Sequence, residues 1–173
     1  MPNDIKWYSI RARAAQPRAA EVLIYGDIGE SWWGESVLAK DFVQEIAALD
    51  VDELTVRINS YGGSVSDGIA IHNAIKRHPA HVTVSIDGVA ASIASLIAMA
   101  GDSVEMAENS LLMIHAPWGA AIGNSADLRD FADMLDTWAE AMATSYAAKT
   151  GCPVEDMQAL LTDGEDLWYY AAD

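Results

Sequence analysis

Two residues have the types and settings needed for nucleophilic catalysis. Ser92 follows an expected strand over residues 81–86 and a run of small residues, and it stands where an apolar helix begins. This setting places its hydroxyl beside the positive end of that helix. His115 follows the apolar run 111–114, so it lies at the end of an expected strand, where functional loops gather. A neutral histidine is the usual base that activates a serine hydroxyl.

Each of these residues also has an ordinary structural explanation. A serine at a helix start usually caps the first turn, and a histidine at the end of a strand is often structural. His72, His78 and His81 lack an equivalent setting, because they fall in a helix, before a proline and at the start of a strand. The case for Ser92 and His115 therefore depends on their occurring together.

Acyl transfer also needs hydrogen-bond donors for the oxyanion. Gly62 and Gly63 follow the expected strand 54–58, in a turn where glycine allows backbone angles that other residues resist. This turn can supply one N–H group, and the N–H of Ile93, directly after Ser92, can supply the other. A glycine pair alone is weak evidence, because any tight turn between a strand and a helix can use it.

The elements that must position these groups alternate between strands and helices. Apolar runs predict strands, and apolar residues at helical spacing predict helices. The expected strands cover 21–26, 54–58, 81–86, 104–106 and 111–114, and the expected helices cover 36–49, 67–77, 92–101, 125–149 and 154–161. The alternation predicts one α/β domain over 21–173, with a sheet covered on both faces. Residues 1–20 lack clear periodicity and are expected to form an N-terminal arm.

Composition excludes several other classes of protein. The chain has 173 residues, and its 26 Asp and Glu against 10 Lys and Arg give a formal charge of −16. Nucleic acid is a poor candidate partner, because affinity for phosphates depends on Lys and Arg. The single Cys152 and the four histidines form no zinc motif or disulfide framework, so we expect no metal and no cofactor. With no expected secretory signal or membrane span, a cytoplasmic location is predicted.

Three motifs resemble the signature blocks of the Clp protease proteolytic subunit. They cover residues 59–63, 88–95 and 113–117, which read Asn-Ser-Tyr-Gly-Gly, Gly-Val-Ala-Ala-Ser-Ile-Ala-Ser and Met-Ile-His-Ala-Pro. They occur in the order and at the spacing of that family. The segments 32–36 and 67–74 also resemble the phage branch of the family, the head maturation (prohead) proteases.

The resemblance implies a serine endopeptidase with a crotonase-like (Clp/crotonase) fold. That fold consists of repeated β-β-α and βαβ units with a long protruding handle helix. Ser92 would be the nucleophile, His115 the general base and Asp166 the third member of the triad. Asp163 and Glu165 are rival acids, because they lie close enough in the sequence to be misaligned with Asp166.

For the oxyanion, the resemblance implies the N–H groups of Gly63 and Ile93, with Gly62 as the alternative to Gly63. The chain departs from the family pattern at Tyr61, where proline is common, so the turn is less constrained. It also stops at Asp173, where relatives usually continue, which suggests a trimmed or processed C-terminal end.

The resemblance also implies partners. The family forms heptameric rings that can stack in pairs, and an AAA+ unfoldase can feed them. We expect a homo-oligomer in the cytoplasm of a bacterial host, with capsid or scaffold protein as substrate. The apolar stripe of the helix over 125–149 either forms an interface or packs on its own sheet. Three alternatives stay open: a catalytically silent ring-forming scaffold, a housekeeping Clp-type peptidase fed by an ATP-dependent unfoldase, and a crotonase-type acyl-CoA enzyme.

Overall fold

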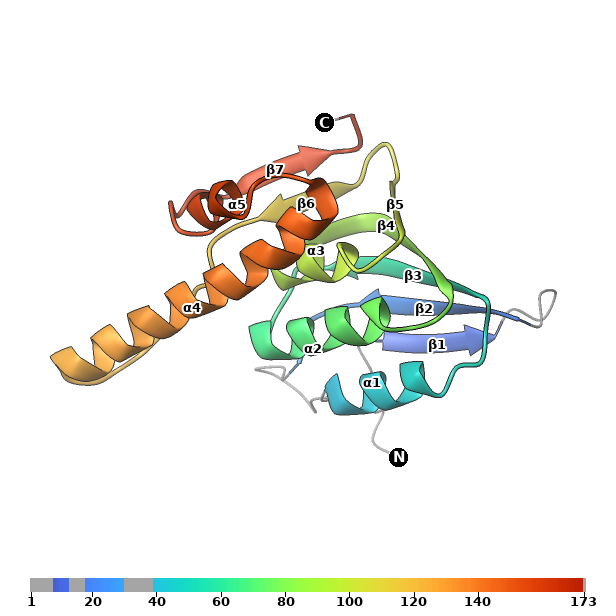
Figure 1. Cartoon of the computed structure of the whole chain (residues 1–173), viewed down its shortest axis with the longest axis horizontal. Coiled ribbons are helices and arrows are strands. Elements are labelled where there is room, and N and C mark those ends of the chain that lie inside the picture. Colours follow the sequence, from blue (N-terminus) through green and yellow to red (C-terminus); the bar gives the residue numbers. More distant parts are fainter. Residues whose placement is uncertain (1–7, 13–17, 30–38, 173) are drawn as a thin grey trace. The chain divides into compact units, whose positions relative to one another are not determined.

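The computed structural model describes most of the chain (Figure 1), namely residues 8–12, 18–29 and 39–172. The chain divides into two compact units, Met1–Met113 with Trp168–Asp173, and Ile114–Leu167. The first unit contains the sheet, and the second contains the longest helix. The expected phage-like segment 32–36 lies outside the described residues.

A seven-stranded mixed sheet forms the centre of the first unit. Its strands are β1 (Tyr8–Ala12), β2 (Ala19–Tyr25), β3 (Glu53–Ser60), β4 (His81–Ala91), β5 (Ser103–Met106), β6 (Leu111–Ile114) and β7 (Leu167–Tyr170). They lie in the order β1-β2-β3-β4-β6-β7, and β5 pairs with β4 off this path. β2 to β6 pair in parallel, whereas β1 pairs antiparallel with β2. The mixed α/β architecture confirms the expected fold class.

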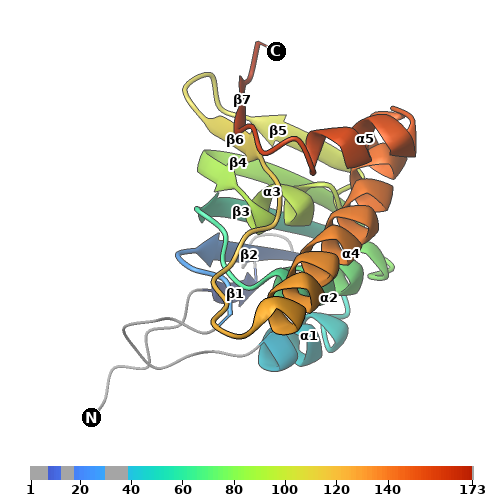
Figure 2. The same cartoon turned by 90° about the vertical axis from the view of Figure 1, so that its left-hand side faces the viewer.

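Three helices lie on the same side of this sheet, as Figure 2 shows: α1 (Ala39–Ala47), α2 (Val65–Lys76) and α3 (Ile93–Ala98). The parallel strands follow one another in a single direction across the sheet, so right-handed crossovers bring every connecting helix to the same face. Buried residues accordingly alternate with less buried ones along β3 and the first half of β4. The expectation of a sheet covered on both faces is therefore wrong for the described part of this unit.

The opposite face of the sheet is polar. Arg57 donates to both carboxylate oxygens of Asp87, from Nε at 2.7 Å and from Nη2 at 2.8 Å. The hydroxyl of Tyr25 donates to the same carboxylate at 2.5 Å. These groups come from three neighbouring strands, β2, β3 and β4, and form one hydrogen-bonded cluster on this face.

Strand β1 differs from the expected N-terminal arm. Tyr8 is only 3% exposed, and its ring meets that of Phe42 edge to face, with centroids 5.1 Å apart. The Tyr8 hydroxyl donates to Glu45 at 3.1 Å, and burial raises the pKa of Tyr8 to about 12. Residues 8–12 therefore belong to the sheet. The signal in the sequence is a short alternation of apolar and polar residues, which the basic residues nearby obscure.

The second unit contains α4 (Ser125–Thr150) and α5 (Val154–Leu160), which pack against each other. Asn124 caps α4, because its side chain accepts from the amide of Asp127 while the Asp127 carboxylate accepts from the Asn124 amide. Gly151, at φ 77°, ends the helix in the left-handed conformation. The predicted long helix is thus confirmed. None of the helices within the described ranges has the length and hydropathy of a membrane span.

Candidate active site

Ser92 occupies a sharp turn between β4 and α3. Its backbone has φ 54° and ψ −132°, and among the described residues it is the one non-glycine residue with a positive φ. Such a conformation costs of order 1–3 kcal/mol and persists only where the surroundings hold it. The Ser92 N–H donates to Met113 O at 3.1 Å, and the Ser92 carbonyl accepts from Ser95. Strand β6, through Met113, and helix α3, through Ser95, thus hold this turn from both sides.

The ordinary explanation of Ser92 as a helix cap does not hold. Its side chain makes no capping hydrogen bond to α3. Serine is favoured at the start of a helix because its side-chain oxygen accepts a hydrogen bond from an N–H group of the first turn. Ser92 makes no such bond. A strained serine at a strand-to-helix turn instead has the geometry of a nucleophile elbow, which presents the hydroxyl to a substrate.

The strain at Ser92 predicts an unusual effect on stability. Ser92→Gly should be more stable than Ser92→Ala by about 1–3 kcal/mol, because glycine adopts positive φ freely. Chemical denaturation of the two variants, followed by circular dichroism, measures the difference in the free energy of unfolding. An alanine variant as stable as the glycine variant would show that this backbone conformation stores no strain.

The glycine turn after β3 packs directly against the Ser92 turn. A Cβ atom on Gly62 would lie 2.7 Å from Ser92 Cβ and 2.9 Å from the carbonyl oxygen of Ala91, so no larger residue fits. Gly62 also has φ 100°. Its N–H donates to the Ser60 hydroxyl at 3.1 Å, and that hydroxyl donates to Gly26 O at 2.6 Å. The Gly62 N–H is therefore already used inside the turn.

Gly63 is held by a backbone bridge to Ile28. The Ile28 N–H donates to Gly62 O and the Ser64 N–H donates to Ile28 O, both at 2.8 Å. These two hydrogen bonds use the Gly62 carbonyl and the Ser64 N–H, which lie on either side of Gly63. The N–H of Gly63 itself takes no part in the bridge and points away from Ile28. Of the two glycines, Gly63 is therefore the one whose N–H group can serve as an oxyanion donor.

Ile93 is the first residue of α3. N–H groups in the first turn of a helix lack partners within that helix, so this amide points out of the helix start. The Ile93 side chain is fully buried, and Gly68 of α2 lies directly against it. Ser92, Gly63 and Ile93 all belong to the first unit.

His115 and Asp166 form a pair within the second unit. His115 Nδ1 lies 3.4 Å from Asp166 Oδ1, and the side chains are 15% and 60% exposed. An imidazole that faces a carboxylate through Nδ1 presents Nε2 on its opposite edge, which suits a general base. The rival Asp163 has another contact, because its carboxylate accepts from the Glu165 N–H at 2.9 Å in a local turn. Of the three acids, Asp166 is the one with a described contact to His115.

Two buried serines of the first unit, which lie at the glycine turn and at the Ser92 turn, were missed in the sequence. Ser60 is 1% exposed and Ser95 is fully buried, and both bond to backbone atoms of the two turns described above. The spacing of Ser95, three residues after Ser92 in an expected helix, was a usable signal. The role of Ser60 depends on Gly26, which is far away in the sequence, so no local pattern reveals it.

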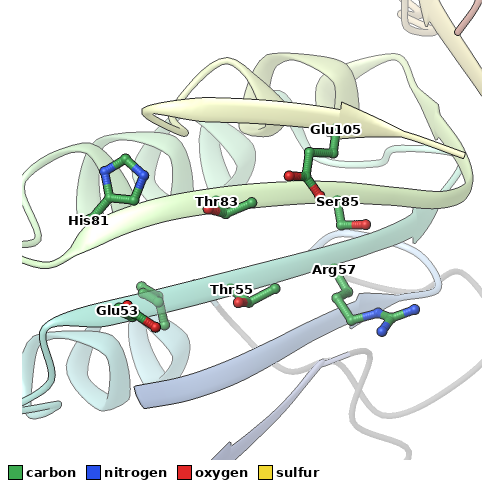
Figure 3. A pocket seen from close by; sticks show the side chains of 8 residues that line it. Glu53, Thr55, Arg57, His81, Thr83, Ser85 and Glu105 are labelled. Carbon is green, nitrogen blue, oxygen red and sulfur yellow. The ribbon is translucent and has the colours of Figure 1, made fainter. Parts of the chain in front are cut away.

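A separate hollow of about 410 Å³ lies on the polar face of the sheet (Figure 3). Side chains from β3, β4 and β5 line it, among them Thr55, Arg57, Thr83, Ser85 and Glu105. None of the candidate catalytic residues is among its lining residues. The described residues also contain no cluster of three or more His, Cys, Asp or Glu side chains suited to a metal ion.

Comparison with known proteins identifies the family. The family described as Clp protease matches residues 6–173. An ATP-dependent Clp protease proteolytic subunit from Pleurastrum terricola is 35% identical, over 61% of this chain and 55% of its own length. The protein of that name from Ligilactobacillus salivarius is 31% identical, over 74% and 64%. The chain thus spans somewhat more than half of these relatives' length. The family match covers almost all of the sequence, and the chain belongs to the Clp protease family.

Proposed function

We propose that the chain is a serine endopeptidase with Ser92 as nucleophile, His115 as general base and Asp166 as the acid that orients His115. The observation that carries the proposal is the strained turn at Ser92, which has no capping role. The pair between His115 and Asp166 supports the assignment of the base. Met113, whose carbonyl accepts from the Ser92 N–H, precedes His115 by two residues in the sequence.

In the proposed acylation step, the Ser92 hydroxyl oxygen attacks the carbonyl carbon of the scissile peptide bond while His115 takes the hydroxyl proton. The carbonyl oxygen becomes an oxyanion, and the N–H groups of Gly63 and Ile93 stabilise it. The C–N bond then breaks, and His115 gives its proton to the leaving amine. Asp166 stabilises the imidazolium that forms between these two transfers.

Deacylation repeats the same proton path with water. His115 removes a proton from the water, whose oxygen attacks the acyl carbon of the ester on Ser92. A second oxyanion forms at the same N–H groups, and its collapse releases the carboxylic acid as Ser92 regains its proton from His115. The direct test is labelling of the chain with a fluorophosphonate probe, followed by intact mass and peptide mapping to Ser92. Absence of labelling would contradict the proposal.

For substrate, we propose capsid or scaffold protein cleaved during phage head assembly. Support comes from the sequence of residues 67–74, which resembles the phage branch of the family. Incubation with candidate capsid and scaffold proteins, compared with an unfolded model protein such as casein, measures this preference. Cleavage that requires ATP and an unfoldase would instead favour the housekeeping alternative.

We further propose that the chain forms a homo-oligomer, with the heptameric ring as the expected form. The second unit exposes large apolar side chains: Trp118 is 74% exposed, Leu128 is 46% exposed, and Ile122 is fully exposed. Large apolar side chains that are exposed to this extent suit an interface between copies. Light scattering after size-exclusion chromatography should give a mass near seven chains. A ring without labelling at Ser92 would identify the silent scaffold, and a monomer at all concentrations would contradict the ring.

A further inference from the structure

The two proposed oxyanion donors share one structural feature. The inference drawn from this feature rests on the proposed function. Each N–H group belongs to a peptide unit whose carbonyl oxygen is itself hydrogen-bonded. A peptide unit is planar and trans, so its C=O and N–H point in opposite directions. A hydrogen bond that fixes the carbonyl oxygen therefore also fixes the direction of the N–H group.

For the Gly62–Gly63 peptide, the anchor is a backbone amide, because Ile28 N–H donates to Gly62 O at 2.8 Å. For the Ser92–Ile93 peptide, the anchor includes a side chain. The Ser95 hydroxyl donates to Ser92 O at 2.6 Å, and the Ser95 N–H donates to the same oxygen at 2.9 Å. Ser95 is fully buried, so water does not compete for this hydroxyl.

We propose that Ser95 is a positioning residue that aims the Ile93 N–H at the oxyanion. The hydroxyl bonds to the carbonyl of the one described non-glycine residue with positive φ, where the backbone would otherwise relax. Relaxation of Ser92 would rotate its carbonyl and the Ile93 N–H together, because both belong to the same rigid unit. The hydroxyl thus acts on the transition state through the peptide, without touching the substrate.

Removal of this hydroxyl should therefore lower the rate of the chemical step, and it should change the affinity for substrate much less. Ser95→Ala keeps the backbone N–H bond and loses the hydroxyl bond, so we expect kcat to fall about 3- to 10-fold, the effect of one hydrogen bond. KM for a peptide substrate should stay within about 2-fold, because the oxyanion exists only in the transition state. Ser95→Cys, which nearly preserves volume but donates weakly, should behave similarly.

Ser110 supplies a matched control within the same unit. It is also fully buried, and it makes the same two bonds at the same spacing, from its hydroxyl and its N–H to Ala107 O, both at 2.9 Å. Ala107 contributes to neither proposed donor. Ser110→Ala therefore removes the same type of bond, at the same burial, from a peptide unit with no expected role in the reaction.

The experiment compares the parent chain with Ser95→Ala, Ser95→Cys and Ser110→Ala. The measurements are kcat and KM on a fluorogenic peptide, affinity for a peptide aldehyde that forms a tetrahedral adduct, and thermal unfolding. We expect both Ser95 variants to lose kcat and aldehyde affinity by similar factors. Ser110→Ala should lose thermal stability to about the same extent as Ser95→Ala while its kcat stays within 2-fold.

Three outcomes would overturn the inference, and each can be distinguished from the others. If the parent is active and Ser95→Ala matches Ser110→Ala in kcat and aldehyde affinity, Ser95 is merely structural while the peptidase proposal stands. If Ser95→Ala raises KM and leaves kcat unchanged, the residue acts on binding rather than on the oxyanion. A parent chain that neither hydrolyses peptide nor labels at Ser92 would overturn the peptidase proposal, and the role of Ser95 with it.

Discussion

Ser92→Ala is expected to reduce peptide hydrolysis by roughly 10⁴- to 10⁶-fold, because the acyl-enzyme route disappears with the nucleophile. The fold should survive, since alanine removes one oxygen from a turn that β6 and α3 hold through backbone bonds. Fluorogenic peptide hydrolysis measures the loss, and fluorophosphonate labelling should vanish in parallel.

The control for this experiment is Ser110→Ala, which removes a buried hydroxyl of the same unit. It should retain activity and labelling. A Ser92→Ala variant that still hydrolyses peptide, or still labels, would show that the nucleophile is another residue.

The second large effect is expected from replacing Asp166, the proposed acid of the triad. Asp166→Asn should lower kcat by roughly 10⁴-fold, because asparagine can donate to Nδ1 and stabilise the tautomer that carries its proton on Nε2. That tautomer cannot accept the proton of Ser92. Stability should change by less than about 1 kcal/mol, since Asp166 is 60% exposed and exposed ion pairs contribute little. Steady-state kinetics and denaturation together separate the two effects.

Two neighbouring acids provide the matched controls for Asp166. Asp163→Asn and Glu165→Gln should keep kcat within a few-fold, because the Asp163 carboxylate bonds locally to the Glu165 N–H. If Asp163→Asn or Glu165→Gln caused the larger loss, the contact between His115 and Asp166 would not be the catalytic one.

The sequence predicted the strands and helices around the candidate site well where a local pattern of residues determines the element. Ser92 falls between an expected strand and an expected helix, and the structure has that arrangement. The long helix α4 was identifiable because the helical spacing of its apolar residues is a local pattern. The contact between Asp166 and His115 could not be predicted from periodicity alone, because it joins residues far apart in the chain.

Other features could not be read from the sequence, for physical reasons. Helix patterns predict how many helices exist but not on which face of the sheet they lie, which depends on strand order and crossover handedness. The bridge between Ile28 and Gly63 joins two turns distant in the sequence. The roles of Ser60 and Ser95 similarly depend on which carbonyl each hydroxyl meets in the folded chain.

The polar face of the sheet has a consequence for how copies of the chain can associate. Its charged and hydroxyl groups include the Arg57 and Asp87 pair and the side chains of Thr83, Ser85 and Glu105. Contact through this face would trap water and depend on ionic strength, because its attractions are electrostatic and salt screens them. Contact through the apolar side chains of the second unit would be dry, and added salt would strengthen it by screening the repulsion between chains of charge −16. The response of the oligomer to added salt therefore identifies which of the two surfaces holds the copies together.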